Sequence, residues 1–77
     1  MFIELHLLPD EENELGESIF INVQNIAFIE DKAYDDSFPD SCKVYVNHNN
    51  MYWFYVQDSY DTVKRMIKEA LENVRNT

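Results

Sequence analysis

The sequence predicts an α+β fold, in which a four- to five-stranded, strongly bent and barrel-like antiparallel sheet is followed by one C-terminal helix. Apolar and polar residues alternate with a period of two in several segments before residue 58, which is the pattern of half-buried strands. After that point, apolar residues recur with the period of a helix. With 77 residues, 45% of them hydrophobic, the chain predicts a single domain, 1–77, with a thin core.

The first two expected strands span residues 2–8 and 18–23. Their alternating apolar residues are Ile3, Leu5 and Leu7 in the first strand and Ile19, Ile21 and Val23 in the second. The segment between them contains Pro9, an acidic run, and Gly16, the only glycine of the chain. Because glycine adopts a positive φ without steric cost, we expect the chain to reverse its direction in this loop.

The middle of the chain predicts three more strands, at residues 26–30, 42–47 and 51–57. The alternation slips at Gln24-Asn25, which indicates a bulge or a sharp bend before the third strand. Residues 31–41 are rich in turn-forming residues and form a loop. The segment His48-Asn49-Asn50 predicts a turn, since asparagine tolerates the left-handed region. The last strand, MYWFYVQ, is aromatic and β-branched without a breaker.

A helix is expected over residues 59–75, with Asp58 or Ser59 as its N-cap. Its apolar residues fall on one stripe that must cover a face of the sheet: Val63, Met66, Ile67, Ala70, Leu71 and Val74.

The last hairpin presents more apolar surface than this helix can cover. Phe54 and Val56 share one face of their strand, while Trp53 and Tyr55 share the other, and Tyr45 opposes its valine neighbours on the preceding strand. A contiguous aromatic patch on a soluble protein marks an interface. We therefore predict a homo-oligomer whose interface uses Tyr45, Trp53 and Tyr55. In the alternative, a strongly curved sheet buries these rings in its own interior.

The charge of the chain restricts its partners. Lys and Arg number 6 against 15 Asp and Glu, which gives a net charge of −9. Residues 1–61 hold 13 acidic and 2 basic side chains, whereas residues 62–77 sum to +2. An acidic body repels phosphate groups, so we expect neither nucleic acid nor a membrane surface as a partner. A basic protein is electrostatically plausible. No signal peptide or membrane span is visible, and we expect a cytoplasmic location.

The sequence predicts no catalytic, cofactor-binding or metal-binding site, and hence a protein that is not an enzyme. One glycine excludes the glycine-rich loops that bind phosphate, and one cysteine, Cys42, excludes a multi-cysteine metal site. His6 and His48 have no second histidine at metal-binding spacing. The acidic loops could supply oxygen ligands to Ca²⁺, but their spacing fits no calcium loop, and a solvated acidic surface is the favoured interpretation.

Three segments carry a resemblance to a known family: FIELHLL, then IFINVQNIAFIED, then VYVNHNNMYWFYVQDSYDTVKRMI. They resemble the FlbD-like (SwrD-like) flagellar and swarming proteins of bacteria, and short uncharacterised phage and Bacteroidetes proteins with the same layout. The matching features are the opening strand, the segment from Ile26 to Glu30, the hairpin, and the cap of the last helix. The resemblance implies a small antiparallel sheet with one C-terminal helix.

We expect a small, acidic interaction or assembly module that associates with itself, without catalytic activity. The alternative function is that of an acidic regulator, or a mimic of DNA, that binds the basic surface of a nucleic-acid-binding protein.

Overall fold

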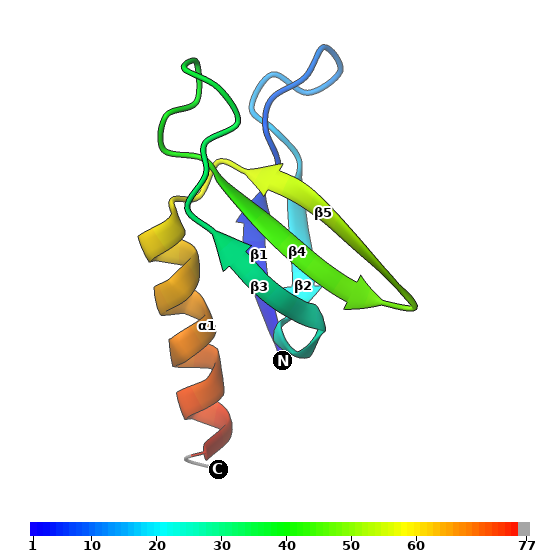
Figure 1. The fold of residues 1–77 in the computed structure, drawn as a ribbon, viewed down its shortest axis with the longest axis vertical. Helices are drawn as coiled ribbons and strands as arrows, with labels where there is room; N and C mark the ends of the chain where they lie inside the picture. Colours follow the sequence, from blue (N-terminus) through cyan, green and yellow to red (C-terminus); the bar gives the residue numbers. More distant parts are fainter. Residues whose placement is uncertain (76–77) are drawn as a thin grey trace.

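A computed structural model describes the backbone of residues 1–75 and the side chains of residues 1–73 (Figure 1). It contains five strands, one short 3₁₀ helix and one α-helix. In chain order these are β1 (Phe2–His6), β2 (Ser18–Asn22), η1 (Val23–Asn25), β3 (Ile26–Glu30), β4 (Cys42–His48), β5 (Asn50–Val56) and α1 (Tyr60–Arg75). The fold is therefore α+β, with antiparallel strands and a C-terminal helix.

The five strands form two sheets, and the prediction of a single barrel-like sheet is wrong. β1 pairs with β2, while β3, β4 and β5 form a separate sheet in that order. The chain changes sheet at η1, which is the sharp bend expected between β2 and β3. The Asn22 side chain accepts a hydrogen bond from the Gln24 N–H at 3.0 Å, and this contact turns the chain out of the first sheet. The third strand then pairs with β4 rather than with β2.

Hydrogen bonds join the two sheets at one corner. Leu7 forms an isolated bridge with Val56, and the Gln57 N–H donates to the His6 carbonyl at 2.7 Å. The Gln57 side-chain amide also donates to the Leu7 carbonyl at 2.7 Å and to the Leu15 carbonyl at 2.9 Å. Gly16 lies in the same corner with a φ of +82°, as the sequence indicated for this loop.

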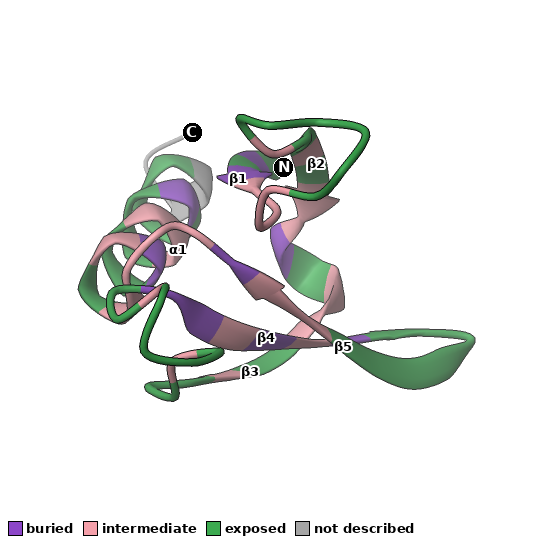
Figure 2. Cartoon of the chain, turned by 90° about the horizontal axis from the view of Figure 1, so that it is seen from above, coloured by how far each residue is buried: buried purple, intermediate pink, exposed green. Residues whose placement is uncertain are grey.

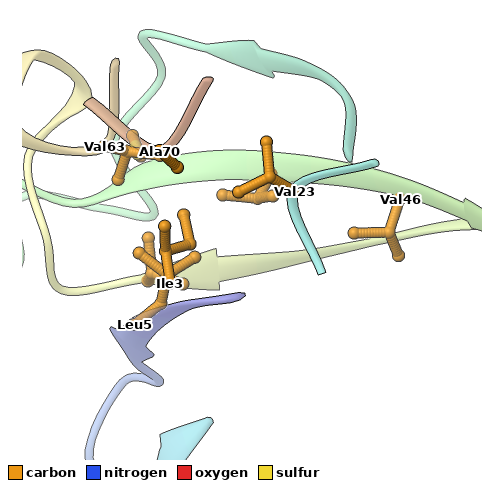
Figure 3. Packing of buried hydrophobic residues seen from close by; sticks show 9 residues of the cluster. Ile3, Leu5, Val23, Val46, Val63 and Ala70 are labelled. Atoms are coloured by element: carbon orange, nitrogen blue, oxygen red, sulfur yellow. The ribbon is translucent and has the colours of Figure 1, made fainter. Parts of the chain in front are cut away.

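The core fills the space between α1, the β1–β2 hairpin and one face of the three-stranded sheet, here called the inner face (Figure 2). Figure 3 shows Ile3 and Leu5 of β1, and Val63 and Ala70 of α1, turned toward this common space. Its buried residues are Ile3, Leu5, Val23, Cys42, Val44, Val46, Val56, Val63 and Ala70. Most are small or β-branched, so the core is thin.

α1 begins after Ser59, whose hydroxyl accepts a hydrogen bond from the Thr62 N–H at 3.2 Å, and Ser59 is thus the N-cap. Of the expected apolar stripe, Val63 and Ala70 are buried, while Leu71 is 49% exposed. The side chain of Val74 lies outside the described residues. The helix and the β1–β2 hairpin lie on the inner side of the three-stranded sheet, and the opposite, outer face is left open (Figure 2).

Candidate interaction surface

The outer face of the β3–β4–β5 sheet carries large aromatic side chains. The strand register places Phe28 opposite Tyr45, Tyr45 opposite Trp53, and Lys43 opposite Tyr55. Directly opposed residues of antiparallel strands project to the same side of the sheet. We call the surface made by Phe28, Lys43, Tyr45, Trp53 and Tyr55 the aromatic face.

The rings of the aromatic face form a row of two contacting groups, with the Lys43 ammonium between them. Phe28 stacks on Tyr45 with ring centroids 4.1 Å apart and an interplanar angle of 21°. Trp53 meets Tyr55 edge to face at 5.9 Å, and Tyr55 meets Tyr34, from the loop before β4, at 5.2 Å. Such pairs contribute about 0.5–1.5 kcal/mol each beyond the burial of area, so the row orders the face without covering it.

Lys43 lies at the centre of this face. Its ammonium is 4.1 Å from the centroid of the Trp53 ring, 5.0 Å from that of Tyr45 and 5.7 Å from that of Tyr55. These are the distances of cation–π contacts. The pKa of the Lys43 ammonium is raised above its ordinary value, mainly by a hydrogen bond with the Tyr45 side chain. The group is therefore charged at neutral pH.

Glu30 borders the aromatic face and balances its charge. The Tyr45 hydroxyl donates to a carboxylate oxygen of Glu30 at 3.3 Å. Glu30 lies opposite Lys43 in the β3–β4 register, so one acidic and one basic group stand on this side of the sheet. The local charge is therefore zero in a chain whose net charge is −9.

The structure places the three predicted interface residues together on this face. Trp53 is 54% exposed, whereas Tyr45 and Tyr55 are half-buried by their neighbours and by Lys43. The sequence reasoning missed Phe28 and Lys43, because their place on the face follows from the pairing register. A signal for Phe28 existed, since it alternates with the apolar Ile29 on the third strand.

The acidic residues gather elsewhere, on the two loops at one end of the molecule (the upper end in Figure 1). Residues 9–17 and 31–41 hold nine of the fifteen acidic side chains and one basic side chain, Lys32. Both loops lie against Gln57, which donates to the Leu15 carbonyl and lines a shallow cleft of about 200 Å³ with Ser37 to Ser41. Among the described residues, no group of three or more His, Cys, Asp or Glu side chains is arranged to hold a metal ion.

Short side-chain hydrogen bonds order these loops. The Asp10 carboxylate accepts from the Asn13 N–H at 2.7 Å, and that of Asp35 accepts from the Ser37 N–H at 2.9 Å. The buried Ser41 hydroxyl donates to the Phe38 carbonyl at 2.6 Å and accepts from the Tyr34 N–H at 2.9 Å. Several acidic side chains thus stabilise turns, which is a structural role for part of the charge.

His6 and Cys42 both contact Asp58 at the corner between the sheets. The His6 side chain is 45% exposed, and its ring Nδ1 lies 3.1 Å from the Asp58 carboxylate, which also accepts the His6 backbone N–H at 2.8 Å. The buried Cys42 thiol donates to the Asp58 carbonyl at 3.4 Å. Burial raises the pKa of this thiol to about 11, and the negative charges of Asp58 and Asp31 add to the effect. Cys42 is therefore protonated at neutral pH and a poor nucleophile.

A second hollow, with both polar and apolar lining, lies between the two hairpins on the inner side. It has a volume of about 240 Å³, and Phe2, Phe20 and Tyr52 project into its rim. These three rings are 64%, 70% and 51% exposed. This volume is below the range of about 300–1,000 Å³ that is typical of small-molecule sites, so the hollow does not favour a small ligand.

The comparisons with known proteins leave the family open: no family model, no curated protein and no solved structure matches this chain. The resemblance to the FlbD-like proteins therefore stays a prediction from the sequence. Within the described part of the chain, no helix has the length and apolar character needed to span a bilayer.

Proposed function

We propose that this chain is a non-enzymatic interaction and assembly module that associates with itself through the aromatic face. The observation that carries the proposal is the row of rings, bridged by Lys43, on a sheet face that the one α-helix of the described residues leaves uncovered. An ordered aromatic surface with a central lysine has the composition of an interface core, in which aromatic residues are enriched.

The distribution of charge leaves one neutral surface through which a second copy can bind. Two chains with a net charge of −9 repel each other, and the repulsion is strongest where the acidic loops would meet. The aromatic face adjoins the 31–41 loop at Tyr55, which contacts Tyr34, and it is itself neutral, since Glu30 and Lys43 balance. Contact through this face joins two copies without bringing their acidic ends together.

Sedimentation velocity over a range from micromolar to near-millimolar concentration tests the proposal. We expect a dimer or larger species that dissociates on dilution, and a Trp53→Ala variant that dissociates at a higher concentration. Leu71→Ala is the matched control, because Leu71 is an equally exposed apolar residue on the helix, outside the aromatic face. A chain that stays monomeric throughout the range contradicts the proposal, and so does an equal effect of the two variants.

A second candidate function is favoured by the placement of nine acidic side chains on two neighbouring loops. In this role the acidic end binds the basic surface of a nucleic-acid-binding protein in place of DNA. The chain would then displace duplex DNA from a purified basic DNA-binding domain, with a steep dependence on salt. A variant with Asp36→Asn and Glu12→Asn lowers the charge of both loops and should compete less well. Displacement that is insensitive to salt contradicts this role.

A further inference from the structure

β5 is an unprotected edge strand. It pairs with β4 on one side only, and its other side is engaged only at Val56, through the bridge to Leu7. Natural edge strands carry a charge, a proline, a bulge or a cover that prevents pairing with another chain. The segment from Asn50 to Val56 has no charged residue, no proline and no glycine, and its pairing with β4 runs without a register shift.

The opposite edge of the same sheet is protected. β3 carries Glu30 and a register shift between Ile26 and Phe28, and the neighbouring helix α1 contacts it. Both strands of the two-stranded sheet are edges and have five residues each; β1 carries Glu4, and β2 is uncharged but directly follows Glu17. β5, with seven residues, is thus the longest edge without a protecting feature among the described strands.

Side chains on both faces of β5 remain about half exposed near its free end. Met51 and Trp53 on the outer face are 53% and 54% exposed, and Tyr52 on the inner face is 51% exposed. The hairpin projects beyond the rest of the molecule at this point (right side of Figures 1 and 2). A partner that only lay on the aromatic face would leave Tyr52 uncovered, whereas a strand paired beside β5 contacts residues on both faces.

The charge pattern identifies the occupant as a second copy. No residue between Lys43 and Asp58 is Asp, Glu, Lys or Arg, and this is the longest such interval in the chain. Two strongly acidic chains can align along this interval without placing like charges opposite each other. An identical strand also has the same aromatic and β-branched composition, which suits cross-strand pairs.

The geometry points to an antiparallel β5–β5 pair between two copies, which joins their three-stranded sheets into one six-stranded sheet. This inference rests on the proposed self-association and specifies its geometry. A two-fold axis perpendicular to the sheet relates the copies, so both aromatic faces lie on the same side. Opposed residues of the two strands must project to the same face of the sheet. The axis therefore lies midway between two copies of the same residue, which stand opposite each other. The free edge runs from Asn50 to Tyr55. The residue near its centre that stands opposite its own copy is therefore either Tyr52 or Trp53.

Three lysine substitutions test the pairing, measured by sedimentation equilibrium with circular dichroism as the control of folding. Met51→Lys and Tyr52→Lys place a charge on opposite faces of β5, and each should raise the dimer dissociation constant by about tenfold or more, as a lysine on a pairing edge does. Phe28→Lys is the matched control on the aromatic face but on β3, and it should change the dissociation constant by less than about threefold. Phe20→Lys tests the edge of β2 and should also have little effect.

The outcomes separate this inference from the proposed function. A wild-type chain that is monomeric at every concentration overturns both. If Phe28→Lys weakens the dimer as much as Met51→Lys while Tyr52→Lys has no effect, the copies stack face to face, and only the strand pairing is overturned. A dimer broken by Phe20→Lys alone places the contact on β2 and overturns the pairing as well.

Amide hydrogen exchange gives a second readout that needs no substitution. Strand pairing forms new backbone hydrogen bonds, so amides within residues 50–55 should exchange at least about tenfold more slowly at high concentration than at low concentration. Contact through side chains alone leaves the outward amides of β5 unbonded. Exchange in this segment that does not change with concentration, in a chain shown to dimerise, overturns the strand pairing.

Discussion

On β4, the inward-facing residues Cys42, Val44 and Val46 are fully buried, whereas their outward-facing neighbours Lys43 and Tyr45 remain partly exposed. The inner face consists of small β-branched side chains that pack against β1 and α1. The outer face carries large rings that contact one another, Lys43, Glu30 and the adjoining Tyr34. One sheet thus separates two tasks: its inner face provides stability, and its outer face and free edge remain available for a partner.

The strongest test of this contrast substitutes adjacent residues of β4. A chain of this length has a free energy of unfolding of about 4–12 kcal/mol. Val44→Asp buries a carboxylate without a partner, which costs several kcal/mol, and we expect the chain to unfold. Tyr45→Asp places the same group on the outer face, where water reaches it, and should leave the fold intact while it weakens the proposed self-association. Urea denaturation and sedimentation velocity measure the two effects. Equal loss of folding in both variants would show that the outer face also supports the core.

The corner at Asp58 supports the core from the side. This carboxylate accepts the His6 backbone N–H and lies within 3.1 Å of the His6 ring. Asp58→Ala leaves both groups without their partner and should lower the free energy of unfolding by about 1–3 kcal/mol. Asp58→Asn is the matched control, because its amide oxygen can still accept the backbone N–H, and it should lose less. If both variants retain wild-type stability in urea, the contact between β1 and the start of α1 contributes nothing.

Cys42 makes the stability of the inner face depend on pH. The fold raises the pKa of its thiol from 9.0 to about 11, because burial and the nearby carboxylates disfavour the thiolate. A group whose pKa is raised by folding contributes stability below its unfolded pKa, and this contribution is lost as the pH rises from about 9 to about 11. The free energy of unfolding should therefore fall more steeply in this window for the wild-type chain than for Cys42→Ala. Parallel curves for the two chains contradict a buried, protonated thiol.

The elements were predictable from sequence because most signals in this chain are local. The period-two segments became strands within two residues of the expected ends, and the turn at Asn49 has the positive φ, +72°, that its residue type indicated. The sheet arrangement was not predictable in the same way. The short 3₁₀ turn that separates β2 from β3 depends on one side-chain contact of Asn22, and a slip in alternation is equally consistent with a bulge within one sheet.

Part of the candidate site was also predictable, because its signals are local in the sequence. Alternation alone assigns Tyr45, Trp53 and Tyr55 to faces of their strands, and the strong hairpin signal joins those faces. Phe28 and Lys43 belong to the site only through the register with neighbouring strands, and the cation–π contacts of Lys43 depend on side-chain conformation. The pairing of His6 with Asp58, 52 positions away in the chain, left no local signal.

The smallest expected effect concerns two adjacent residues of β3, and it tests whether the rings of the outer face contribute to stability. Phe28 is 51% exposed and stacks on Tyr45, so Phe28→Ala should lower the free energy of unfolding by about 1 kcal/mol. Ile29 packs against the core from the other side of the strand, and Ile29→Ala should lower it by about 2 kcal/mol or more. Urea denaturation of both variants, well below the dissociation constant of the dimer, isolates the fold from association. A greater loss for Phe28→Ala would mean that the aromatic row stabilises the monomer itself, and the division of tasks between the two faces would not hold.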